Sequence, residues 1–181
     1  MYDSFESKAK TILNESLNQQ RTFSATTKTY DIFLSHSSSD AALVAGLKLE
    51  LEDLGFSVYV DWIEDPKLSR ANVTKDTALV LQGRMKQCKA LLYAFSENAA
   101  SSKWMPWELG YFDGIKGTVA VLPISKTSKS SFNGSEYLGI YYYIEIATTQ
   151  NTNQNALWVC ESATKYVSYE QWLTGNQPYE R

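Results

Sequence analysis

The sequence predicts an α/β fold in which helices cover both faces of a parallel sheet. Short apolar runs of strand length alternate with segments of helical periodicity, and this alternation is typical of parallel sheets. The chain has 181 residues, of which 44% are apolar and 20% are charged, as in an ordinary globular protein. This length fits one domain with a short appendage.

The N-terminal segment predicts an amphipathic helix followed by a linker, together spanning residues 1–28. The helix over residues 4–20 places its apolar side chains on one stripe: Phe5, Ala9, Ile12, Leu13 and Leu17. The polar stretch 18–28 is typical of a linker.

The first strand and helix of the domain follow the linker. Residues 30–35 form a short apolar strand, and Ser37 with Asp40 makes a capping-box pattern at the start of the next helix. That helix carries leucines at helical spacing, and Gly55 ends it. The leucines are Leu43, Leu47, Leu51 and Leu54.

Three more strands follow along the chain. Residues 56–61 and 89–95 are strand-like, with a polar, proline-bearing loop over 62–70 and a helix over 73–88 between them. A shorter helix over 103–113 precedes a strand over 119–123. Pro106 lies near the start of that helix, where a proline is tolerated.

The C-terminal third is less regular. A Ser/Lys-rich loop spans 125–136, and residues 140–144 form a fifth strand. The polar stretch 147–155 predicts no clear element, and 168–174 indicates a final helical turn. We treat residues 147–181 as an extension that completes the domain or lies beside it.

Polar side chains follow three of the predicted strands. Ser35 and His36 end the first strand, Asp61 and Trp62 end the second, and Ser96 follows the third. The carboxyl ends of parallel strands share one edge of a sheet, and ligands bind there. The sequence therefore predicts a site at this edge.

Composition limits the chemistry of that site. His36, Cys88 and Cys160 are the only histidine and cysteines, which is one ligand short of a four-ligand zinc site. The net charge of −3 gives no general attraction to nucleic acid or to an anionic membrane. The histidine and cysteine count leads us to expect no metal. Because no apolar run has membrane-spanning length, we expect a cytoplasmic protein. Carboxylates are the natural candidates for catalysis.

Several enzyme classes fit the sequence poorly. It contains no G-x-G-x-x-G, so hydride chemistry with a bound dinucleotide is disfavoured. It contains no G-x-S-x-G, which disfavours a hydrolase triad built on His36. A phosphorylated receiver domain is disfavoured because its aspartate would follow the third strand, where Ser96 stands.

Three motifs resemble those of Toll/interleukin-1 receptor (TIR) domains of bacteria. Residues 30–40, YDIFLSHSSSD, are similar to the first-strand box, and residues 58–70, VYVDWIEDPKLSR, stand where the family's BB loop belongs. Trp104 to Glu108 matches W-x-x-x-E. The resemblance covers residues 29–146, which we take as the domain.

The resemblance implies a flavodoxin-like, five-stranded parallel sheet and cleavage of NAD+ at the bond between nicotinamide and ribose. It implies that Glu108 is essential and that NAD+ is a substrate, not a cofactor. The product would be ADP-ribose or a cyclic or conjugated ADP-ribose signal, as in antiphage defence. The BB loop contains Pro66 but no glycine, unlike that of animal adaptors, and this disfavours an adaptor role based on that loop.

The proposed chemistry suits the residues. Trp104 and Glu108 are four residues apart and share a helix face, in a first turn that favours an ionised carboxylate. A carboxylate stabilises the oxocarbenium-like ribose that forms when nicotinamide leaves. Trp104 can stack on a flat cationic ring. Equally, Glu108 can be a solvated residue at a helix start and Trp104 a core side chain.

We expect seven further residues to contact the substrate. Lys67 and Arg70 are candidates to meet the pyrophosphate, although each is also compatible with an ordinary charged loop. The full set is Ser35, His36, Asp61, Trp62, Trp104, Lys67 and Arg70.

Two functions remain open at this point. One is an NAD+ glycohydrolase or cyclase, and the other is a non-catalytic TIR module that signals by assembly with other TIR domains. An enzyme requires Glu108 and an adaptor does not. The expected partners are NAD+, further copies of the chain and an effector activated by the nucleotide product.

Overall fold

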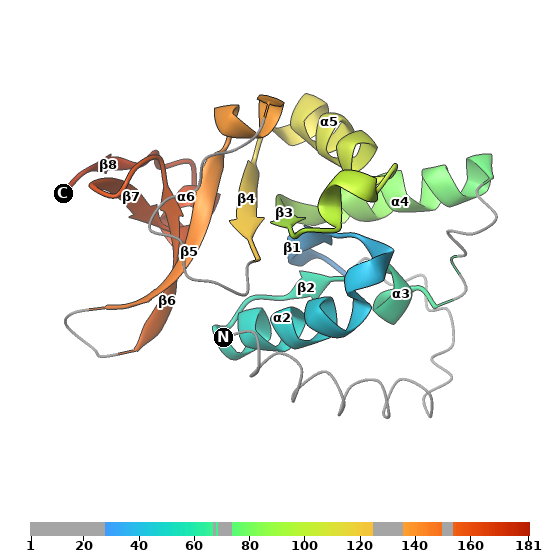
Figure 1. The fold of residues 1–181 in the computed structure, drawn as a ribbon, viewed down its shortest axis with the longest axis horizontal. Helices are drawn as coiled ribbons and strands as arrows, with labels where there is room; N and C mark the ends of the chain where they lie inside the picture. The colour runs from blue at the N-terminus through green and yellow to red at the C-terminus, as the bar shows by residue number, and fades with distance from the viewer. Residues whose placement is uncertain (1–27, 67, 69–73, 125–135, 150–153) are drawn as a thin grey trace.

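The computed structural model describes residues 28–66, 68, 74–124, 136–149 and 154–181 (Figure 1). Three predicted features therefore lie outside the described residues: the helix over 4–20, the linker before Lys28 and nearly all of the loop over 125–136. Lys67 and Arg70 also lie outside them.

The described strands form one sheet in the order β2-β1-β3-β4-β5-β6-β7-β8. The strands are β1 (Tyr30–Ser35), β2 (Val58–Tyr59), β3 (Cys88–Phe95), β4 (Val119–Pro123), β5 (Tyr142–Thr148), β6 (Asn155–Cys160), β7 (Lys165–Ser168) and β8 (Tyr179–Glu180). The first five are parallel and have the flavodoxin-like order 2-1-3-4-5. The predicted fold class is confirmed.

The strand count corrects the sequence prediction of five. Strands β6, β7 and β8 continue the sheet beyond β5 in antiparallel pairing. Antiparallel strands with one uncovered face alternate apolar and polar residues, so they lack the uniform apolar runs by which buried parallel strands are recognised. The polar stretch 147–155 contains the end of β5 and the start of β6.

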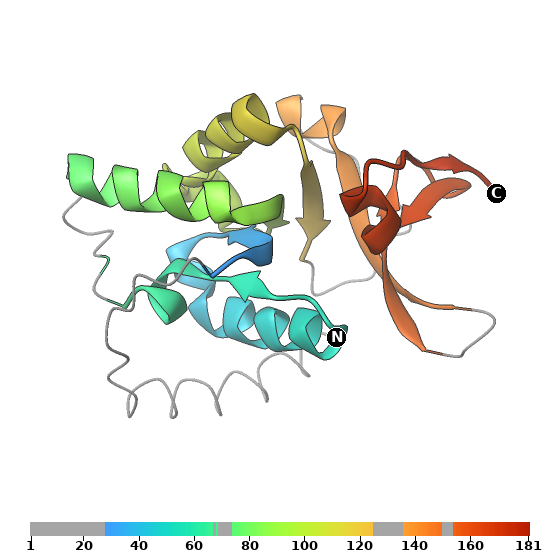
Figure 2. The same ribbon diagram turned by 180° about the vertical axis from the view of Figure 1, so that it is seen from behind.

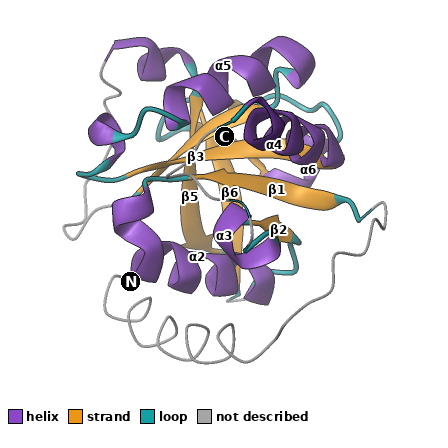
Figure 3. Cartoon of the chain, turned by 90° about the vertical axis from the view of Figure 1, so that its right-hand side faces the viewer, coloured by secondary structure: helices purple, strands orange, loops and turns teal. Residues whose placement is uncertain are grey.

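Helices lie on both faces of the sheet, as Figures 1 and 3 show. They are α2 (Ala41–Asp53), α3 (Asp61–Glu64), α4 (Lys75–Gln87), α5 (Met105–Lys116) and α6 (Tyr169–Leu173), with 3-10 turns η1 (Ser38–Asp40), η2 (Ala99–Ser101) and η3 (Glu136–Ile140). In Figure 3, α4 and α5 lie above the parallel strands and α2 and α3 lie below them.

Three elements differ from the sequence prediction. The strand predicted over 56–61 is reduced to β2, Val58–Tyr59. The residues after Asp61, predicted as loop, begin with the single helical turn α3. The fifth strand runs over Tyr142–Thr148 instead of 140–144, because η3 takes up residues 136–140 and leaves Ile140 exposed. An apolar Ile-Tyr-Tyr-Tyr-Ile run alone does not reveal that its first residue ends a 3-10 turn.

The core consists of one apolar cluster on each face of the sheet. On one face, Ile32 and Leu34 of β1 pack with the leucines of α2, and Phe33 packs on the other face with α4 and α5. Tyr169 and Trp172 of α6 belong to the α2 cluster. Figure 2 shows α6 beside the antiparallel strands. The antiparallel strands and the parallel strands therefore share one core.

Candidate active site

Glu108 lies in the first turn of α5, where its carboxylate is fully buried. Pro106 fits this turn because the first turn needs no backbone donor from it. The Glu108 amide donates to the Trp104 carbonyl at 2.8 Å, which fixes the backbone of Glu108 relative to that of Trp104. Met105, Leu109 and the next apolar turn anchor the helix in the core. The helix that the sequence predicted for Glu108 is present.

Ser35 contacts Glu108 directly. The Ser35 hydroxyl donates to Oε2 of Glu108 at 2.6 Å, and both side chains are buried. This O–O distance is typical of a hydroxyl bonded to an ionised carboxylate. Ser35 ends β1, and its backbone pairs with that of Tyr93 on β3. The sheet thus brings together two residues that are 73 positions apart.

Tyr93 is a neighbour of Glu108 that the sequence analysis did not single out. Burial, followed by the charge and hydrogen bond of Tyr137, raises the pKa of the Tyr93 phenol, and the Glu108 charge raises it further. Tyr93 therefore stays protonated beside the carboxylate. Its place inside a predicted core strand concealed this role, because only the register of β1 against β3 brings it beside Ser35.

His36 and Asp61 meet on the opposite side of the strand end. Nε2 of His36 lies 3.6 Å from Oδ1 of Asp61, and both side chains are at most 3% exposed. Nδ1 of His36 lies 2.9 Å from the carbonyl oxygen of Leu34. The predicted convergence of the ends of β1 and β2 is present in the structure.

Trp104 is half-buried at the start of α5. Its ring meets that of Trp107 edge-on at 5.2 Å, and Trp107 stacks on Tyr111 at 5.8 Å between ring centres. Trp104 also packs against the apolar cluster beneath α5. It thus combines a core contact with a partly open ring, and its predicted stacking on substrate remains a prediction.

Trp62 lies beside Asp61 in α3 and packs against the α2 cluster. Its indole Nε1 is buried and has no hydrogen-bond partner among the described residues. An unpartnered N–H beside the rim can donate to a bound ligand. The substrate contact predicted for Trp62 therefore stays a prediction.

Asp40 does not complete the predicted capping box. The Ser37 hydroxyl accepts from the Ser39 amide, but the Asp40 carboxylate turns away to the segment after β3. There it accepts hydrogen bonds from Ser96 at 2.5 Å and from Asn98 at 2.6 Å. Asp40 thus ties the ends of β1 and β3 together, which local sequence could not show.

Buried and partly buried hydrogen bonds to Asp65 and Glu64 hold the end of α3. The Asp65 carboxylate accepts two hydrogen bonds from Arg84 of α4, each 2.8 Å long, and a third from Tyr59. Glu64 accepts a hydrogen bond from Tyr30 at 2.8 Å. Burial alone would raise the pKa of Glu64, but the hydrogen bonds from Tyr30 and Lys28 outweigh it and lower the pKa.

A hollow of about 380 Å³ lies at the opposite end of the strands. It is bounded by Lys116, Thr118, Tyr142 and Trp172, and none of the predicted site residues lines it. Because β4 and β5 begin beside it, it lies away from the carboxyl rim. We place the candidate active site at Glu108 and not in this hollow.

Comparison with known proteins identifies the family. The family model described as "TIR domain" matches residues 32–157, which is more than half of the chain.

The chain belongs to the TIR domain family.

This TIR domain is 54% identical over 150 residues to a Bacillus cereus (strain MSX-D12) protein named "Probable 3' cyclic ADP-D-ribose synthase ThsB'". The match covers 82% of this chain and 78% of that protein. A Cytobacillus dafuensis protein named "Putative cyclic ADP-D-ribose synthase TIR2" is 30% identical over 107 residues, covering 59% of this chain and 28% of that protein. The resemblance inferred from the three motifs is confirmed.

A solved structure is also similar to this TIR domain. The TIR domain of the Toll-related Receptor TRR-2 from Hydra magnipapillata matches with a TM-score of 0.45 and 14% identity. The match covers 64% of this chain and 84% of that one.

Two further features concern the described part of this TIR domain. Within it, no helix is long and apolar enough to cross a membrane. The described residues also contain no group of three or more histidine, cysteine or acidic side chains arranged to hold a metal ion.

Proposed function

We propose that this TIR domain cleaves NAD+ between nicotinamide and ribose and converts the remainder into a cyclic ADP-ribose. The proposal rests on Glu108 of the W-x-x-x-E motif. Its buried carboxylate accepts a hydrogen bond from the Ser35 hydroxyl. The printed name of the 54% identical relative supports the same reaction.

The chemistry requires a fixed negative charge more than a proton donor. The bond between C1′ and the nicotinamide nitrogen breaks, and its electron pair neutralises the ring nitrogen. Positive charge then develops on the ribose, and a preorganised carboxylate in a water-poor site stabilises it. The role of Glu108 is this stabilisation. The Ser35 hydroxyl holds the carboxylate through its Oε2 oxygen.

The printed name of the 54% identical relative favours cyclisation over hydrolysis. In cyclisation, a hydroxyl of the ADP-ribose itself forms the new bond to C1′ and loses its proton to solvent, whereas in hydrolysis a water molecule attacks the same carbon. The cyclic product is therefore the one we propose, as a signal in bacterial defence that activates a separate effector.

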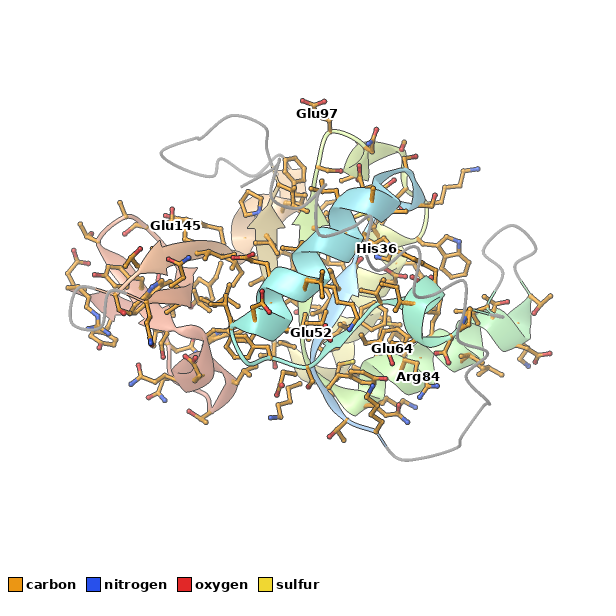
Figure 4. All side chains as sticks on the ribbon, turned by 90° about the horizontal axis from the view of Figure 1, so that it is seen from below. His36, Glu52, Glu64, Arg84, Glu97 and Glu145 are labelled. Atoms are coloured by element: carbon orange, nitrogen blue, oxygen red, sulfur yellow. The ribbon has the colours of Figure 1, made fainter. Side chains whose placement is uncertain are left out.

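The proposal is tested by Glu108→Gln. We expect the variant to fold and to release nicotinamide about 100- to 1000-fold more slowly, because it loses a charge interaction made in the transition state. Chromatography of NAD+ incubations resolves nicotinamide, ADP-ribose and cyclic products. Glu97→Gln is the matched control, since Glu97 is exposed (Figure 4) and should tolerate the same change.

Two results would contradict the proposal. If Glu108→Gln releases nicotinamide at the parental rate, the carboxylate is not catalytic. If the folded parent releases none at any concentration, the TIR module acts by assembly alone.

We also propose that activity depends on self-association. Glu108 is fully buried, so NAD+ reaches it only after a rearrangement, which contacts between copies of the chain would favour. Specific activity should therefore rise with protein concentration. Assays over a hundredfold dilution series, run beside light scattering, check this. A constant specific activity from a monomer would refute the dependence.

A further inference from the structure

Two neighbouring residues at the end of β1 contact opposite layers of the protein. The Ser35 hydroxyl reaches Glu108 of α5, and the His36 imidazole faces Asp61 of α3. Helices α5 and α3 lie on opposite faces of the sheet (Figure 3). One dipeptide therefore links the helix that carries the catalytic carboxylate to the helix that follows β2.

The imidazole also fixes the backbone of Ser35. The Leu34 carbonyl oxygen can only accept a hydrogen bond, so Nδ1 of His36 carries the proton between them at 2.9 Å. This bond joins the residue before Ser35 to the residue after it. The ring that it closes contains the whole Ser35 backbone and restrains the direction of its hydroxyl.

Asp61 is itself held in place. It begins α3, whose far end is fixed by Glu64 and Asp65 through hydrogen bonds from Tyr30 and Arg84. The His36 and Asp61 side chains are 2% and 3% exposed. Each imidazole nitrogen thus faces a protein oxygen, and the ring is closed off from solvent on all sides.

We propose that His36 is a positioning residue that acts through Ser35. The imidazole holds the Ser35 backbone through its bond to Leu34, Ser35 aims its hydroxyl at Glu108, and Asp61 lies on the far side of the ring, 3.6 Å from Nε2. This assigns His36 a role other than the substrate contact predicted from the sequence. The kinetic test of this inference rests on the proposed NAD+ cleavage.

The kinetic test is a double-variant cycle. His36→Ala and Ser35→Ala should each lower kcat about 10- to 100-fold, the effect of losing a hydrogen bond to a charged group, and leave KM within about twofold. In the His36→Ala background, Ser35→Ala should change kcat by less than about threefold, because the hydroxyl is already misdirected. His36→Asn, which can retain the bond to Leu34, should restore part of the loss.

Asp31→Asn is the control for a general loss of stability. Asp31 lies at the other end of β1, where it bonds Ser57 and Lys89. This variant should lower the melting temperature without changing kcat. The inference is overturned if the effects of His36→Ala and Ser35→Ala multiply, if KM rises while kcat holds, or if Asp31→Asn lowers kcat equally.

A second measurement needs no activity. His36 is the only histidine of the chain, so ¹⁵N spectra of the untagged protein contain a single imidazole. We expect Nδ1 to be protonated, and we expect Asp61→Asn to shift the Nε2 resonance more than that of Nδ1. A proton on Nε2 alone would overturn the inference. If the parent protein releases no nicotinamide, the proposed function is overturned. The ¹⁵N measurement then still decides whether His36 has the positioning role.

Discussion

The parallel and antiparallel halves of the sheet differ in where they keep polar side chains. At the carboxyl rim of the parallel half, the polar groups of Ser35, His36 and Glu108 are buried. In the antiparallel half, polar contacts lie at the surface: the Lys165–Glu161 pair is 38% and 45% exposed. Arg181 lies over the Tyr179 ring, and Tyr179 is also exposed.

This difference indicates which half carries the chemistry. Burying polar and charged groups costs free energy unless they are bonded to each other, whereas exposed pairs contribute little either way. The parallel half bears this cost at several side chains of its rim, among them the three above and Asp61. The antiparallel half contributes apolar surface to the common core through Tyr169 and Trp172.

The largest effect is expected when one large side chain is removed from the core that the two halves share. Trp172 is 5% exposed, and Trp172→Ala should lower the free energy of unfolding by about 3–5 kcal/mol. Because both halves pack into one cluster, we expect a single unfolding transition in thermal melts. Tyr179→Ala, at an exposed position, is the control and should change stability little. Two separate transitions would show that the halves unfold independently.

A smaller effect is expected at Trp104, which belongs to the parallel half. Trp104→Ala should lower nicotinamide release about tenfold or more while costing less stability than Trp172→Ala, since Trp104 is only half-buried. Trp104→Phe keeps an aromatic face and should retain partial activity. NAD+ assays beside melts separate the cases. An activity loss that merely follows the unfolded fraction would place Trp104 in the core.

The smallest expected effect is a difference in alkylation rate between one thiol in each half of the sheet. Burial raises the pKa of Cys88 in β3 and of Cys160 in β6 to about 12. Because only the thiolate reacts, both should resist alkylation at pH 8 until the chain opens locally. Cys160, in the antiparallel half, is 4% exposed and should react before Cys88, which is fully buried. Peptide mass spectrometry over time measures the order, and the reverse order would contradict the comparison.

The same thiols predict the direction of an alkaline effect. A folded-state pKa raised above the ordinary 9.0 means that the folded state favours the neutral thiol. The stabilisation is complete below pH 9 and is lost as the pH rises toward 12. Denaturant unfolding across this range should show the free energy of unfolding falling as the pH rises. A Cys88→Ala, Cys160→Ala double variant should show a smaller fall.

The sequence by itself determined three central strands of the parallel half and the helix that carries Glu108. Buried parallel strands are continuous apolar runs, so β1, β3 and β4 could be placed from local pattern. Pro106 and the apolar spacing of α5 placed Glu108 in a helical first turn, because both act within a few residues. The carboxyl rim followed from a general property of parallel sheets.

The tertiary structure alone decided the antiparallel strands and the partners at the rim. The Ser35–Glu108 bond spans 73 residues and depends on the strand order and on the register of β1 against β3. Likewise, the Asp40 carboxylate accepts a hydrogen bond from Ser96, 56 residues away, and does not cap its own helix. Such contacts depend on which strands become neighbours. That choice minimises the free energy of the whole core, which no local pattern of residues contains.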